Sequence, residues 1–223
     1  MATPQQLSKQ IAALTGLAAR DVRALMAQVE SRAVAQAALS DVLPALIETY
    51  GAAATAIAAD WYDEVRAAQE VAGSFSAIPS EAGDRGAHEL IGWAAAKATD
   101  DAAFTSLLLG GLQRRIANAG RDTIIGSSLA DPRAEGWMRL GQGPSCAFCM
   151  MLIGRGAVYS EDSVKFGAHD DCNCQAGPKF AGKADLFDVN DYVKSQKRRT
   201  EDTTKRDNAR AREWIAEHIT PLE

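Results

Sequence analysis

The sequence is poor in several features that mark specialised protein classes. Aromatic residues make up only 6% of its 223 residues and alanine dominates the apolar share, which favours packed helices over a β-sandwich. No uninterrupted apolar run reaches about 18 residues, so we expect no membrane span. The first ten residues lack the charged and apolar regions of a secretory signal peptide. We therefore expect a chain made in a cytosol, where thiols stay reduced.

Strong positive charge is also missing, because the net charge is −5. This balance argues against a protein that coats nucleic acid along its whole length. One segment departs from it. Residues 194–212 hold eight basic and three acidic side chains, a local charge of +5. The simplest interpretation of this segment is a solvated helix face.

Apolar residues in the first 130 positions follow the three- and four-residue spacing of helices. Thr3 and Pro4 form a start signal, because threonine caps free backbone amides and proline suits the first helical position. We expect Gly16 to separate two helical stripes. A new helix should begin near Ser40, with Pro44 in its first turn, where proline is tolerated.

The remaining segments complete a mainly α fold. Glycine, serine and proline in residues 72–86 predict a loop, and two further helices should follow it. Two closely spaced glycines and a proline in residues 136–145 suggest a short strand that runs into a turn. We expect three parts: a helical body over 1–130, a small zinc-binding α+β segment over 131–182, and a charged helical C-terminal tail over 183–223.

All four cysteines lie within 29 consecutive residues, next to one of the three histidines. The pattern is C-x2-C, then 19 residues, then H-x2-C-x-C, and the five donors are Cys146, Cys149, His169, Cys172 and Cys174. Zinc (Zn²⁺) prefers four such ligands in a tetrahedron. Either all four cysteines bind and His169 lies outside them, or His169 replaces Cys172 or Cys174.

Local geometry is compatible with both ligand sets. The first pair should lie on a short helix that ends at Gly154. Cys172 and Cys174 are two residues apart, so in an extended segment both would face the same side. Two disulfides or unrelated buried thiols are the alternatives to a metal. The abundance of thiolates favours a closed structural site over a catalytic one with an open position.

The segment from residue 136 to 180 resembles the phage Mu F-like minor capsid (head morphogenesis) proteins, especially those of actinobacterial tailed phages. The residues that carry the resemblance are Trp137, Arg139, Cys146, Phe148, Cys149, Arg155, Gly156, Tyr159, His169, Cys172 and Cys174. The resemblance implies a low-copy protein of the virion, assembled in the host cytoplasm and bound near the portal vertex. It implies partners among the portal and other head proteins, a role in head assembly or genome delivery, and no established enzymatic activity.

Two other functions stay open from the residues alone. A zinc-dependent hydrolase or nuclease could use His169, Asp170 and Asp171, since a metal-bound water needs a nearby acid or base. A zinc-ribbon-like nucleic-acid binder could use the basic tail. In the tail, Lys197, Arg198 and Arg199 are the candidates for contact with packaged DNA, although the tail lacks interleaved aromatics for base stacking.

Overall fold

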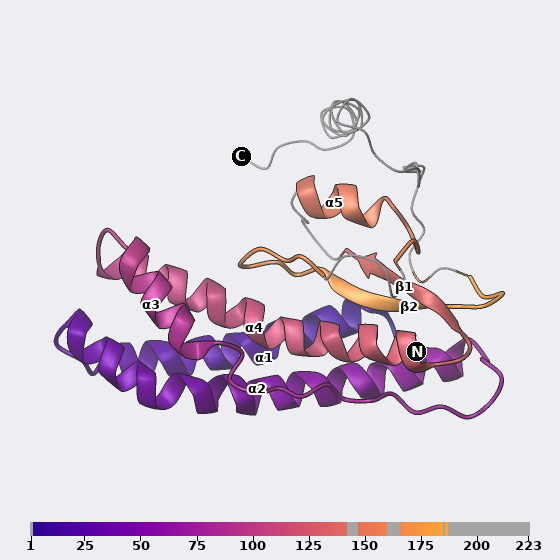
Figure 1. Cartoon of the computed structure of the whole chain (residues 1–223), viewed down its shortest axis with the longest axis horizontal. Helices are drawn as coiled ribbons and strands as arrows, with labels where there is room; N and C mark the ends of the chain where they lie inside the picture. The colour runs from indigo at the N-terminus through magenta and orange to yellow at the C-terminus, as the bar shows by residue number, and fades with distance from the viewer. Residues whose placement is uncertain (1, 142–146, 160–165, 185, 187–223) are drawn as a thin grey trace.

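A computed structural model of the chain describes residues 2–141, 147–159, 166–184 and 186. Its elements are, in order, α1 (Pro4–Met26), α2 (Arg32–Ala68), α3 (Ala87–Lys97), α4 (Asp101–Ala130), β1 (Ala134–Leu140), α5 (Ala147–Ile153) and β2 (Gln175–Phe180). The long helices form a bundle, the two strands lie along α4, and α5 lies on the other side of the strands (Figure 1). The mainly α fold class is confirmed. The charged tail from residue 187 onward lies outside the described residues.

Side-chain caps fix the starts of the three longest helices. Thr3 accepts a hydrogen bond from the Gln6 amide at 3.2 Å, which confirms the predicted start of α1. Ser31 does the same for α2 through the Val34 amide, at 3.3 Å. Asp100 caps α4 at 2.7 Å from the Ala103 amide. Each cap satisfies an amide that has no partner within its own helix.

Two predicted helix boundaries are wrong. α1 runs straight through Gly16, and α2 begins at Arg32 and contains Pro44 in its interior. A helical glycine costs only about 1 kcal/mol, and the fully buried Leu7, Ala18 and Val22 lie on both sides of Gly16. Packing on both sides of each breaker therefore outweighs the local preference of the backbone to end the helix.

α2 is the central helix of the bundle. By length and composition alone it is apolar enough to cross a membrane, although polar residues such as Glu48 interrupt its apolar stretch. In the structure α2 contacts α1, α3 and α4. Leu39, Leu43 and Ile47 are fully buried there. The apolar face of α2 is thus used in packing helices against each other.

The two strands join the core of the bundle. β1 and β2 pair antiparallel, with Trp137 opposite Pro178 and an irregularity between Ala134 and Gly136. Phe180 on β2 meets the Tyr62 ring of α2 edge-on, with ring centroids 5.7 Å apart. Buried apolar residues of the helices and of the strands form one continuous cluster. The predicted boundary at residue 131 therefore lies within a region of shared packing.

Candidate metal centre

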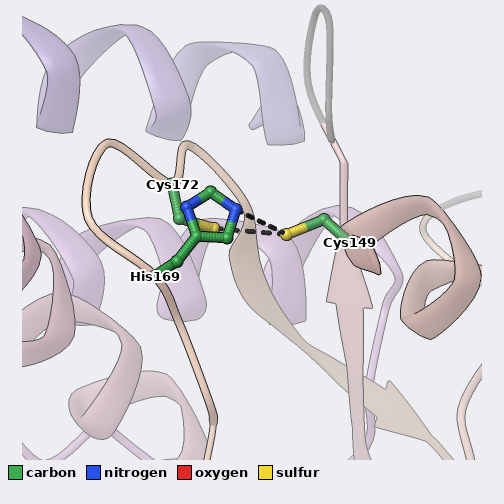
Figure 2. A group of neighbouring side chains, drawn as sticks. All are labelled: Cys149, His169 and Cys172. Carbon is green, nitrogen blue, oxygen red and sulfur yellow. Dashed lines mark hydrogen bonds between the residues drawn. The ribbon is translucent and has the colours of Figure 1, made fainter. Parts of the chain in front are cut away.

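A short helix and a loop bring three of the five predicted ligands together. Cys149 lies on α5, while His169 and Cys172 come from the loop before β2 (Figure 2). Their ligand atoms all lie within 4.8 Å of one another. The Cys149 Sγ is 3.5 Å from the Cys172 Sγ and 3.7 Å from the His169 Nε2. This group could hold a metal ion, because thiolates and imidazole are the preferred ligands of zinc and related ions.

The other two predicted ligands have different positions. Cys174 is buried and lies directly before β2, and it is not one of the three grouped ligands. Its thiol influences the pKa values of Cys149 and Cys172, so it lies near the cluster. Cys146 lies outside the described residues. The choice between the two ligand sets thus remains a prediction.

The thiols influence each other's protonation. Hydrogen bonds with Cys172 and Cys174, together with burial, raise the pKa of Cys149. Hydrogen bonds from Cys149 and Cys174 lower the pKa of Cys172, and the charge of Arg121 lowers it further. The Cys149 and Cys172 sulfurs are too far apart for the bond of about 2.0 Å in a disulfide. The cluster therefore combines thiol and imidazole donors that influence each other's pKa, and such a donor set suits a metal cation.

Helix α4 holds the loop that carries the second half of the cluster. Arg121 donates to the carbonyl oxygens of Cys174 and Cys172, at 2.9 and 2.6 Å. Gln113 donates to the same Cys172 carbonyl at 3.1 Å. On the same loop, the His169 Nδ1 lies 2.6 Å from the Asp170 carbonyl oxygen, which directs Nε2 toward Cys149.

Two acidic residues follow His169: Asp170 forms an ion pair with α4, and Asp171 is exposed. Asp170 forms an ion pair with Arg114 at 3.2 Å. A Cβ added at Gly110 would come within 3.0 Å of the Asp170 Cβ, so the small residue permits this close approach. Asp171 is exposed and has a positive φ of 61°. The Asp170 carboxylate is thus paired with α4, whereas the Asp171 side chain belongs to an exposed residue.

Three aromatic residues pack in the same apolar core as the buried cysteines: Trp137, Tyr159 and Phe166. The Trp137 ring stacks on Tyr159 and on Phe166, with centroids 4.4 and 5.7 Å apart. The Arg139 guanidinium lies 3.7 Å from the Phe166 ring centroid, and that of Arg155 lies 5.5 Å from Tyr159. Four of the residues that carried the resemblance, Trp137, Arg139, Arg155 and Tyr159, therefore form one connected group with Phe166. The side chain of Phe148 lies outside the description.

Sequence reasoning missed Arg121, Gln113 and Phe166. The first two lie on a helix more than 50 residues before the cysteines they contact. No local spacing connects such residues, so only a long-range contact reveals them. One signal was present: Arg121 interrupts an apolar face of the long helix, between Ala117 and Ile124.

Comparison with known proteins places the chain in a family. A family model described as VG15 protein matches residues 2–210. The "Gene 15 protein" of Mycobacterium phage D29 is 45% identical over 67 residues, which cover 28% of this chain and 24% of that relative. The match thus spans about a quarter of the relative's length, and no solved structure matches. Since the family model covers most of the chain, the protein belongs to the VG15 family, a phage protein family.

Proposed function

We propose that this chain is a minor capsid (head morphogenesis) protein of a tailed phage, present in few copies near the portal vertex. One structural observation carries the proposal. The Cys149, His169 and Cys172 cluster lies on a helical bundle and within a segment of Mu F-like pattern. Membership of a phage protein family supports a role in the virion. Head assembly or genome delivery is the step in which such a protein acts.

The metal in this proposal is zinc and its role is structural. Cys149, His169 and Cys172 would hold it, with Cys174 or Cys146 completing the tetrahedron. Bound zinc supplies folding free energy, which α5 and the loop 166–174 need because short segments bury little apolar surface. The result is a stiff projection on the bundle. A docking surface of this kind requires a fixed shape and no chemical step.

The arrangement favours a structural site over a hydrolytic one. A hydrolase needs a carboxylate that is available to a metal-bound water, and the Asp170 carboxylate is paired with Arg114. Incubation of the zinc-loaded protein with plasmid DNA and with model phosphodiesters tests the alternative. We expect no metal-dependent cleavage. Cleavage abolished by Asp170→Asn but kept in Asp122→Asn, a control at an exposed ion pair on α4, would favour the nuclease.

Incorporation into particles tests the proposed location. A phage carrying the gene would be propagated with the wild-type chain, with Cys149→Ser, or with His88→Ala as a control at an exposed helical histidine. Quantitative mass spectrometry of purified particles should find a few wild-type and His88→Ala copies per particle, and far fewer Cys149→Ser copies. A wild-type chain abundant in infected cells but absent from particles would refute the virion assignment.

The partners proposed for the chain are the portal and other head proteins, and packaged DNA through the tail. Lys197, Arg198 and Arg199 lie outside the described residues, so this part of the proposal rests on the sequence. Reversal of the three charges to glutamate should weaken DNA binding, and wild-type log affinity should fall linearly with log salt. Salt-independent binding, or unchanged binding after the reversal, would leave the tail as a solvated segment.

A further inference from the structure

Arg121 is the most completely buried cation in the part of the chain that the structure describes. Its exposure is 0%, and it ranks first by volume among the fully buried side chains. Its guanidinium donates to three oxygens: the Cys174 and Cys172 carbonyls and the Asn118 side chain, the last at 2.7 Å. All three acceptors are neutral. Among the described residues, no carboxylate contacts this guanidinium.

A buried cation without a counter-charge is costly, because burial removes its hydration. Burial lowers the pKa of Arg121, while the charges of Cys172, Cys174 and Cys149 oppose this change. A second guanidinium, of Arg139, is 3% exposed and shares the Phe166 ring with Arg121, at 3.7 and 4.9 Å from its centroid. In the described region Arg139 likewise has a neutral partner, the Gly167 carbonyl at 2.9 Å.

Two buried cations on one aromatic ring repel each other, and negative charge nearby would stabilise both. The thiol cluster is the group that can supply it. A divalent ion with three thiolates and one imidazole carries a net charge of −1, and one with four thiolates carries −2. A neutral cluster of protonated thiols would leave both guanidinium groups uncompensated. The electrostatics of the surroundings therefore fit an anionic metal–thiolate centre.

We propose that Arg121 is a positioning residue of the metal centre, which fixes the Cys172–Cys174 turn through its two carbonyl oxygens and offsets the negative charge of the bound thiolates. This inference rests on the proposed metal centre. The carbonyl bonds fix the peptide planes that directly follow Cys172 and Cys174, and they thereby restrict the directions of both thiols. Arg121 also ties the centre to α4, so metal binding is coupled to the helical bundle.

The test compares Arg121 with another buried arginine. Arg121→Lys keeps the charge and loses the two-carbonyl geometry, and Arg121→Met loses both. The matched control is Arg66→Lys, because Arg66 is also buried and multiply hydrogen-bonded but contacts Asp131 and the 71–73 backbone. Zn²⁺ affinity is measured by competition with a chromophoric chelator. Co²⁺ loading reports the thiolate-to-metal absorption band, and acid titration gives the pH at which the metal is released.

Arg121→Lys should bind Zn²⁺ about 10- to 100-fold more weakly, the usual loss for a residue that orients metal ligands. Arg66→Lys should bind it as the wild type does while unfolding more easily. Without the nearby cation the thiols hold protons more tightly, so Arg121→Met should release the metal at a higher pH than Arg121→Lys. The Co²⁺ band should change in both Arg121 variants and not in the control.

Two results would overturn the inference, and they differ from each other. In the first, the wild type binds metal, and Arg121→Lys matches Arg66→Lys in Zn²⁺ affinity, in the Co²⁺ absorption band and in the pH at which metal is released. Arg121 would then contribute only to the stability of the fold. If the wild type binds neither Zn²⁺ nor Co²⁺, the metal centre itself is wrong and this inference falls with it. Should Arg121→Met fail to fold, Arg121→Lys alone decides the affinity comparison.

Discussion

At the scale of single residues, buried charges are neutralised in two different ways. Arg66 meets a carboxylate directly: its Nε lies 2.9 Å from Asp131, whose side chain has no exposed surface. Arg121 donates to carbonyl oxygens instead. The first pair is complete within the protein, whereas for Arg121 we propose that metal-bound thiolates supply the counter-charge. Single substitutions can therefore separate ligands, counter-charges and structural ion pairs.

His169→Ala tests whether the imidazole is a ligand. Its Nε2 belongs to the close group of ligand atoms, so its loss should weaken Zn²⁺ affinity by more than the roughly 10- to 100-fold expected for a residue outside the coordination shell. His88→Ala is the control, because His88 is exposed on α3. Chelator competition measures both. Equal affinities would show that four cysteines bind and that His169 lies outside the ligand set.

Asp131→Ala should be severely destabilising. It leaves Arg66 buried without its counter-charge, which typically costs about 3–5 kcal/mol, and also removes a partner of the Tyr62 hydroxyl. Asp101→Ala breaks the exposed Arg32 pair, where Asp101 is 78% exposed, and should change stability by less than about 1 kcal/mol. Urea unfolding compares the two variants. Similar losses would contradict a special role for the buried pair.

At the scale of elements, close helix approaches decide which glycines matter. Gly111 on α4 faces Leu90 of α3, and an added Cβ would lie 2.2 Å from the Leu90 Cδ1. Leu90 is buried, so it has little room to move. Gly16 in α1 has nothing within 4 Å of such a Cβ. The same residue type thus serves packing in one helix and is unneeded in the other.

Gly16→Ala and Gly111→Ala should have opposite effects. In α1 the change should stabilise by up to about 1 kcal/mol, because alanine has the higher helix propensity. In α4 the clash with Leu90 should outweigh that gain, since overpacking costs about 1–3 kcal/mol. Thermal unfolding of both variants provides the comparison. A gain in both would mean that α3 moves away from α4 at little cost.

At the scale of the whole molecule, the strands connect the metal centre to the bundle. Both strands contact α4, and Phe180 packs on Tyr62 of α2. α5 contacts β1, while the loop 166–174 is held by α4 through Arg121, Gln113 and Arg114. The parts that depend most on metal should therefore be α5 and the loop. The strands share the apolar core of the helices.

Metal removal should loosen one region and spare the rest. After treatment with a chelator, limited proteolysis should cut within residues 141–174, while the four long helices and both strands stay protected. Far-UV circular dichroism should keep most of its helical signal, because the bundle has its own buried apolar residues. Readdition of Zn²⁺ is the control and should restore protection. Loss of the whole helical signal would show that bundle and metal centre unfold as one unit.

The sequence by itself determined the features that depend on neighbouring residues. Helical periodicity, the Thr3 cap, the strand near Trp137 and the short helix at Cys149 were all predictable, because each depends on spacings of a few positions. The pairing of a C-x2-C element with H-x2-C-x-C was equally visible, since zinc ligands come in closely spaced pairs. In the structure Cys149, His169 and Cys172 lie together and could hold a metal ion, while the full ligand set stays a prediction.

The tertiary structure alone decided the features that depend on distant packing. Gly16 and Pro44 do not end their helices, because burial on the bundle outweighs local preference. Arg121 and Gln113 reach the cysteine loop from α4 across more than 50 positions. Side-chain contacts at such separations leave no periodic trace in one sequence. The types and spacing of the candidate ligands were therefore predictable from the local sequence. The residues of α4 that contact the ligand loop could be identified only from the folded structure.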